Sequence, residues 1–211
     1  MVSTGSLTSK TIIGCVIAAV LWTVMFSPWT SPYLNFWVTM TCSALILTTY
    51  SSIIIKEWWK DVKFAWSDIA IGVTLAAALW GIFWIGDRLS SMMFDFARPQ
   101  VNSIYGMKDG ENPVILTLLM LLIIGPAEEI FWRGCIQKNF SKIWNPDIGF
   151  IATTLVYGLV HIAKFNFMLI MAALVAGFIW GLAYRFFPER LGAIILSHAL
   201  WDCAVFIWFP I

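Results

Sequence analysis

The sequence predicts an all-α fold, a polytopic bundle of transmembrane helices, and three observations lead to this prediction. Apolar residues make up 60% of the 211 residues, and charged residues only 12%, whereas about 25% charged residues is usual for soluble domains. Tryptophan is abundant, with 13 copies. Apolar runs of about 20 residues, the length of a membrane-spanning helix, recur along the chain. A soluble protein of this size could not bury so much apolar surface.

Seven apolar runs are long enough to span a bilayer, and we interpret them as one integral membrane domain covering residues 1–211. Their approximate bounds are 11–27, 33–55, 68–86, 113–140, 147–165, 168–187 and 191–209. The first run lacks a small-x-small cleavage site and is followed at once by another apolar run, which favours a retained signal anchor. The fourth run contains Pro126, which removes a backbone hydrogen bond and predicts a kink.

The polar stretch 87–112 separates the third and fourth runs. Apolar side chains such as Met92, Phe94 and Phe96 are mixed with its charges, which is typical of an interfacial segment or a lid. If the stretch re-enters the membrane, the number of spans becomes eight. The sequence does not choose between these arrangements.

The basic residues predict a cytoplasmic amino terminus. With seven spans threaded from that side, eight Lys/Arg residues fall in cytoplasmic segments and four in outer ones, leaving Arg133 inside a span. Lys and Arg are enriched on the cytoplasmic side of membrane proteins. We therefore expect an integral protein of the plasma membrane whose carboxyl terminus lies outside.

Composition excludes several classes of partner and cofactor. The net charge of +1 and the lack of a basic cluster exclude a nucleic-acid partner. The spacings of the four cysteines fit neither a zinc ribbon nor a disulfide framework, so we interpret them as packing residues. The sequence contains no nucleotide-binding glycine motif, and we expect no cofactor and no bound metal.

Six ionisable residues lie inside the late spans, where such residues are rare. A charged residue at the centre of a membrane helix costs about 2.5 to 3.5 kcal/mol on insertion scales. Intramembrane ionisable residues therefore indicate a functional site. The six are Glu128, Glu129, Arg133, His161, His198 and Asp202, and they include both histidines of the chain.

The first cluster of these residues is GPAEEIFWRG, from residue 125 to 134. Glu129 and Arg133 are i and i+4 on a helix, so they can form an ion pair. Glu128 is turned away by about 100° and has no partner of its own on the helix. The alternative is that all three residues end a helix near the interface, with Arg133 extending towards water.

The other two clusters each place a histidine on one helix face with a second polar residue. Tyr157 and His161 are four residues apart, as are His198 and Asp202. Asp202 could fix the tautomer of His198 through a ring N–H. Alternatively, His161 is a packing residue, and His198 with Asp202 is a polar contact between helices.

These clusters can together hydrolyse an acyl bond if their side chains converge. Glu128 and one histidine could polarise a water as a general base, while the other histidine with Asp202 could stabilise the developing oxyanion. A shared site would explain the presence of all these intramembrane polar residues. Unrelated roles would require several costly intramembrane groups at similar depth.

The three clusters resemble the motifs of the CAAX-protease and bacteriocin-processing family, also called Abi. The chain has the first motif, EExxxR, then an aromatic residue four positions before His, then His four positions before Asn or Asp, all within 113–211. The resemblance implies a glutamic-type intramembrane endopeptidase with a cavity open towards the cytoplasm. By this resemblance Glu128 and His161 activate water, and His198 and Asp202 line the oxyanion hole. Glu129 and Arg133 support the geometry.

Two positions depart from the usual family pattern. Tyr157 stands where Phe is commoner, and Asp202 stands where the eukaryotic-type CAAX endopeptidases have Asn. An ionised Asp cannot donate to an oxyanion. Asp202 must therefore be protonated or act only by orienting His198, and a prenylated CAAX tail is not required as the substrate. We expect a membrane-associated or lipidated protein or peptide.

Other functions remain open at the level of sequence. Glu128, Glu129, His161 and His198 could bind Zn²⁺ in a metal-dependent membrane protease, although no HExxH motif is present. A non-enzymatic scaffold or immunity protein would use the same residues for packing. A proton-coupled transporter would use them as a relay, but internal repeats, which are common in transporters, are absent.

Overall fold

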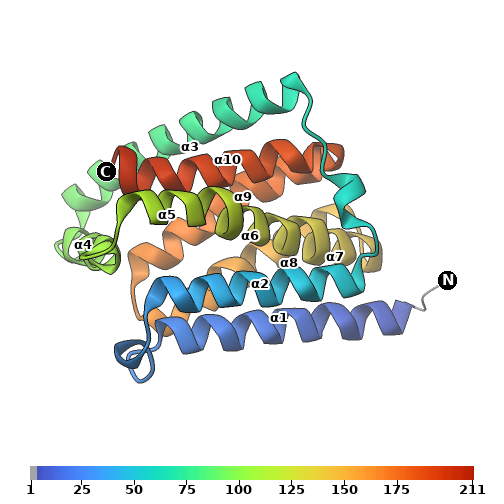
Figure 1. Cartoon of the computed structure of the whole chain (residues 1–211), viewed down its shortest axis with the longest axis horizontal. Helices are drawn as coiled ribbons and strands as arrows, with labels where there is room; N and C mark the ends of the chain where they lie inside the picture. The colour runs from blue at the N-terminus through green and yellow to red at the C-terminus, as the bar shows by residue number, and fades with distance from the viewer. Residues whose placement is uncertain (1–3) are drawn as a thin grey trace.

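The computed structural model of the protein describes residues 4–211, and all regular secondary structure in that range is helical. Its principal helices are α1 (Thr4–Phe26), α2 (Phe36–Ile54), α3 (Trp66–Met93), α4 (Ala97–Tyr105), α5 (Pro113–Leu119), α6 (Gly125–Phe131), α7 (Lys138–Ile143), α8 (Pro146–Leu159), α9 (Phe167–Phe186) and α10 (Leu191–Cys203). The long helices lie side by side as one bundle (Figure 1). The predicted all-α fold is confirmed.

Seven helical segments of the described chain are long and apolar enough to cross a membrane, as predicted. They are Gly5–Phe26, Phe36–Ile54, Trp66–Met93, Pro113–Ile143, Pro146–Lys164, Phe167–Phe186 and Pro188–Trp208. The stretch 87–112 supplies no further span. Most bounds agree with the expected runs within a few residues, because each run ends where polar residues or prolines begin.

Asparagine starts four of these helices. The side chains of Asn35, Asn112, Asn145 and Asn166 each accept a hydrogen bond from a backbone N–H in the first turn of α2, α5, α8 and α9. Asparagine is among the best residues at this position because it satisfies an N–H that has no partner within the helix. The helix starts are therefore encoded locally.

The third span is longer than predicted, and this corrects our expectation that 87–93 belongs to a loop. Helix α3 continues to Met93, so Asp87 and Arg88 lie within the helix. The Asp87 carboxylate forms an ion pair with Arg98 of α4, which compensates for its burial. The ion pair also ties α4 to the end of α3.

The fourth span continues as one helical segment past Pro126. Two π-helical turns, Met120–Ile124 and Trp132–Gln137, flank α6, in whose first turn Pro126 lies. A π-helical turn contains an additional residue, so the chain can accommodate the missing hydrogen bond of proline without leaving the helix. Such turns are frequent at functional sites, and here they flank the two glutamates.

Helix α4 covers one end of the bundle, which we call the α4 end. The carboxyl terminus lies at the α4 end, and the start of α1 lies at the opposite end (Figure 1). Tyr105 Oη accepts a hydrogen bond from the backbone N–H of Ile211, and Asn166 Nδ2 donates to the Gln100 carbonyl. These bonds link α4 to α9 and to residue 211.

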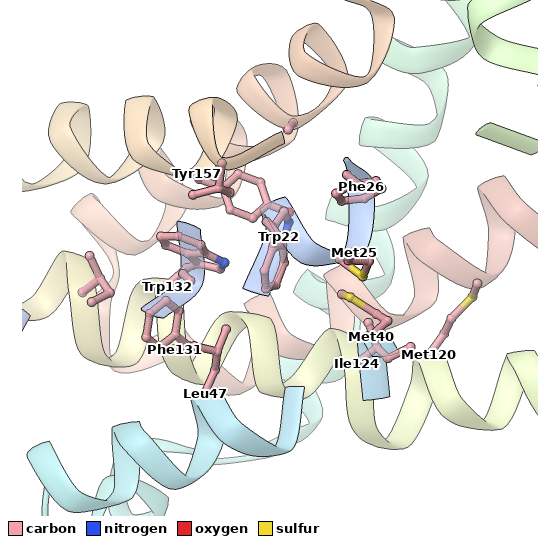
Figure 2. Close-up of a cluster of buried hydrophobic side chains, with 14 of the residues drawn as sticks. Trp22, Met25, Phe26, Met40, Leu47, Met120, Ile124, Phe131, Trp132 and Tyr157 are labelled. Atoms are coloured by element: carbon pink, nitrogen blue, oxygen red, sulfur yellow. The ribbon is translucent and has the colours of Figure 1, made fainter. Parts of the chain in front are cut away.

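The largest buried cluster joins the amino-terminal helices to the late spans. Figure 2 shows Trp22 of α1 beside Tyr157 of α8, with Trp132 and Phe131 of the fourth span nearby. The Trp22 and Trp132 ring centroids are 6.4 Å apart in an edge-to-face arrangement, a favourable geometry for aromatic pairs. Helix α1 therefore contacts the region that carries the intramembrane polar residues.

Candidate active site

One cavity brings most of the predicted site residues together. Its volume is about 440 Å³, within the range of small-molecule sites. The motif residues on its wall are Glu128, Tyr157, His161, His198 and Asp202. The rest of the wall is almost entirely apolar and comes from α1, α2, α3, α4, α9 and α10. Three spans thus supply the polar motif groups of one cavity.

Glu129 and Arg133 do not line the cavity but form a buried network behind it. Arg133 Nη1 donates to Glu129 Oε1 over 2.8 Å, and both side chains are at most 1% exposed. Arg133 Nη2 donates to the carbonyl of Gly177 over 3.2 Å. The guanidinium also lies 5.0 Å from the ring centroid of Tyr157. The ion pair predicted from the i, i+4 spacing is present.

His198 is held mainly by Glu129. His198 Nδ1 lies 2.6 Å from Glu129 Oε1, while Nε2 lies 3.5 Å from Asp202 Oδ2. Because a carboxylate can only accept, the proton is on Nδ1. Trp180 stacks on the imidazole with ring centroids 3.9 Å apart. We expected Asp202 to fix the tautomer of His198, but the shorter contact comes from Glu129.

Glu128 differs from Glu129 in its position, because Glu128 lines the cavity whereas Glu129 does not. The residue is 6% exposed, and its Oε2 atom has no hydrogen-bond partner within the described residues. A buried, unpaired carboxyl oxygen is costly. Since Glu128 lines the cavity, its carboxyl group lies beside the space in which a water or substrate group would bind.

Both ring nitrogens of His161 are occupied. Nδ1 lies 2.8 Å from the carbonyl of Tyr157, and Nε2 accepts a hydrogen bond of 3.0 Å from the indole Nε1–H of Trp22. A carbonyl only accepts and an indole N–H only donates. His161 is therefore neutral, with its proton on Nδ1 and the lone pair of Nε2 directed at Trp22.

Two aromatic residues of this site were missed by the sequence analysis. Trp22 contacts His161 from α1, and Trp180 of α9 stacks on His198. The pair Gly177 and Gly181 on α9 is a small-xxx-small pattern, which predicts close helix packing near Trp180. Nothing in the sequence distinguishes Trp22 from the other tryptophans, because its partner lies 139 residues away.

The cavity lies in the half of the bundle nearer the α4 end. Its wall includes Phe26 at the end of α1, Phe36 at the start of α2, and Val101 and Tyr105 of α4. The start of α1 is at the other end of the bundle (Figure 1). The cavity and the start of α1 therefore lie towards opposite ends of the bundle.

Comparison with known proteins matches part of the chain to a family model. Residues 110–204 match the family model described as "Type II CAAX prenyl endopeptidase Rce1-like". An uncharacterized protein of Mycoplasma capricolum subsp. capricolum is 23% identical over 160 residues, which are 70% of this chain and 45% of that protein. The chain thus spans less than half the length of this relative. No solved structure matches the chain.

The matched segment contains every motif residue of the site, from Glu128 to Asp202, whereas Trp22 lies outside it. The three motifs, their order along the late spans and the family match agree with one another. Residues 110–204, just under half of the chain, thus match a model of the CAAX-protease and bacteriocin-processing family.

Proposed function

We propose that this protein is an intramembrane endopeptidase that hydrolyses peptide bonds of membrane-associated or lipidated substrates by a water activated at Glu128. The observation that carries this proposal is the unpartnered Oε2 atom of Glu128 in a cavity that it shares with His198 and Asp202. A general base needs such an available oxygen within reach of water. The remaining groups of the cavity can then act on the substrate.

His198 is suited to stabilise the oxyanion of the tetrahedral intermediate. Glu129 faces its Nδ1 at 2.6 Å, and Asp202 faces its Nε2 at 3.5 Å. Carboxylates beside both nitrogens favour an imidazolium that donates from each of them. In the transition state the Nε2–H would donate to the oxyanion instead of to Asp202. The new hydrogen bond would be charge-assisted. Asp202 then acts as a counter-ion that orients His198, so its departure from the usual Asn is accommodated.

The substrate class follows from the lining of the cavity. Apart from the motif residues, apolar side chains such as Met25, Met40 and Val205 make up nearly all of the wall. Such a wall favours an apolar peptide segment or an acyl or prenyl chain over a polar peptide. We propose a protein or peptide that reaches the site from the bilayer.

The basic residues support a cytoplasmic amino terminus in the plasma membrane. Eight Lys/Arg residues lie at the end of the bundle where α1 starts: Lys10, Lys56, Lys60, Lys63, Lys138, Lys142, Arg185 and Arg190. Four lie towards the α4 end: Arg88, Arg98, Lys108 and Lys164. By the positive-inside rule, the α4 end faces away from the cytoplasm. Cleavage would then take place in the outer half of the membrane.

Cysteine labelling tests this orientation. Asn102 is exposed on α4, and Lys56 is exposed at the opposite end. Asn102→Cys should react with a membrane-impermeant maleimide in intact cells, whereas Lys56→Cys should react only after the membrane is opened. The unsubstituted protein measures the background of its own cysteines. The reverse pattern would place the cavity in the cytoplasmic half.

Zinc is the main rival within the enzyme class, and two of its four candidate ligands are already engaged. Glu129 is bonded to Arg133, and His161 Nε2 accepts from Trp22. We expect activity to survive strong chelation and the purified protein to carry no stoichiometric zinc. Loss of activity on chelation with recovery on adding Zn²⁺ would favour the metal mechanism.

The deciding experiment compares membrane-protein termini in cells that express the wild type, Glu128→Gln or Glu57→Gln. Glu57 is an exposed residue paired with Lys60 far from the cavity, so it controls for the loss of one carboxylate. New termini should appear with the wild type and with Glu57→Gln, and should be absent with Glu128→Gln. Termini that are identical in all three would indicate a scaffold or transporter instead.

A further inference from the structure

The proposed mechanism leaves one histidine unable to act in the state that the structure shows. His161 is expected to assist Glu128 as a base, and for this it needs a nitrogen lone pair facing water. Its only lone pair, on Nε2, accepts the indole N–H of Trp22 over 3.0 Å. Its other nitrogen donates to the Tyr157 carbonyl. While this bond persists, His161 can take no proton from a water molecule.

The bond between Trp22 and His161 is not an obligatory consequence of burying an indole. Buried tryptophans usually find a partner for their N–H. Within the described chain, however, the buried Nε1 atoms of Trp132 and Trp201 have none. The interior therefore tolerates unpaired indoles, and the direction of Trp22 towards His161 is a specific feature of this site.

Trp22 also lies where an occupant of the cavity would meet it. It is 1% exposed and lines the cavity together with Met25 and Phe26 of the same helix. The cavity beside the indole has a volume of about 440 Å³. A substrate segment in the cavity would contact both partners of the bond.

We propose that Trp22 is a latch on His161: its indole N–H holds Nε2 in the empty enzyme, and a substrate that displaces the indole releases Nε2 to act with Glu128. This inference rests on the proposed function and adds its regulation. Trp22 is a positioning residue, acting on the reaction through His161. The latch lies in α1, outside the segment that matches the family.

Acylation by diethyl pyrocarbonate tests the state of the His161 lone pair without any substrate. The chain has two histidines, so mass spectrometry can follow both, and His198, which has a carboxylate at each ring nitrogen, should stay unreactive. Trp22→Phe keeps an aromatic ring but removes the donor. Loss of one hydrogen bond should increase the His161 rate about two- to tenfold and leave the His198 rate unchanged.

Trp37→Phe is the matched control. Trp37 is also a buried tryptophan on the wall of the cavity, but its Nε1 donates to the carbonyl of Met107. Its replacement should leave both histidine rates as in the wild type. If Trp22→Phe proves unstable on thermal unfolding, Trp22→Leu provides a second variant without the donor. Equal His161 rates in the wild type and in the Trp22 variant would overturn the proposal.

Turnover distinguishes a latch from a bond that supports catalysis. With the membrane protein whose new terminus depends on Glu128 as substrate, Trp22→Phe should equal or exceed the wild type in kcat, by up to about tenfold. A kcat below that of the wild type would show that the indole N–H is required, and would overturn the latch. If no terminus depends on Glu128, the proposed function fails, whereas the acylation rates still report whether Trp22 holds His161.

Discussion

The two adjacent glutamates of α6 lie on different sides of the helix, in different surroundings. Behind the helix, Glu129 is 0% exposed and bonded to both Arg133 and His198. On the cavity side, Glu128 and Asp202 line the space in which a substrate would bind, and Asp202 makes only a 3.5 Å contact with His198. Buried charges are tolerated when they are paired, so the rear network can hold the helices together. The cavity side can then keep groups available for chemistry.

The largest effect is expected when the carboxylate of Glu128 is removed. Glu128→Gln should lower turnover by at least about 100-fold, the lower range for a general base, because an amide cannot take the proton. Stability should be unchanged or higher, since an ionisable group leaves a desolvated site. Turnover and thermal unfolding in the same detergent measure both. A variant that loses its fold would show that Glu128 is structural.

The second effect is expected when the buried network of Glu129 and Arg133 behind the cavity is broken. Glu129→Gln leaves the Arg133 guanidinium without its counter-ion, and such a loss costs about 3–5 kcal/mol in buried pairs. It also weakens the hold on His198, so activity should fall together with the melting temperature. Glu57→Gln, which breaks an exposed pair with Lys60, should change the melting temperature little. A Glu129→Gln variant as stable as this control would mean that the two glutamates are assigned the wrong way round.

The third and smallest effect is expected from a substitution that moves α6 away from α10. A Cβ on Gly125 would lie 2.8 Å from the Cα of Ala199, so Gly125→Ala must push α6 away from α10. Overpacking of this kind costs about 1–3 kcal/mol, and the shift would lengthen the contact between Glu129 and His198. In α3, Gly81→Ala meets no atom within 4 Å and should be neutral or stabilising, because Ala favours helix. Thermal unfolding of both variants gives the comparison.

Local features of the sequence predicted most of the fold. The seven spans follow from the length of the apolar runs, and the Glu129–Arg133 pair follows from a spacing of four residues on a helix. One local expectation was wrong: helix α3 continues past residue 86, and its Asp87 is paired with Arg98. The fourth span continues through Pro126, with a π-helical turn on either side of α6.

The sequence by itself determined the membrane-spanning fold, the order of the spans and the identity of the motif residues, since these depend on composition and on spacings within single helices. Only the tertiary structure decided how those residues are paired. Glu129 rather than Asp202 makes the short contact with His198, and Trp22 engages His161 from a helix 139 residues away in sequence. It also decided that the cavity lies towards the α4 end. Such contacts depend on how helices rotate and pack against one another, and helical periodicity within one span carries no information about that packing.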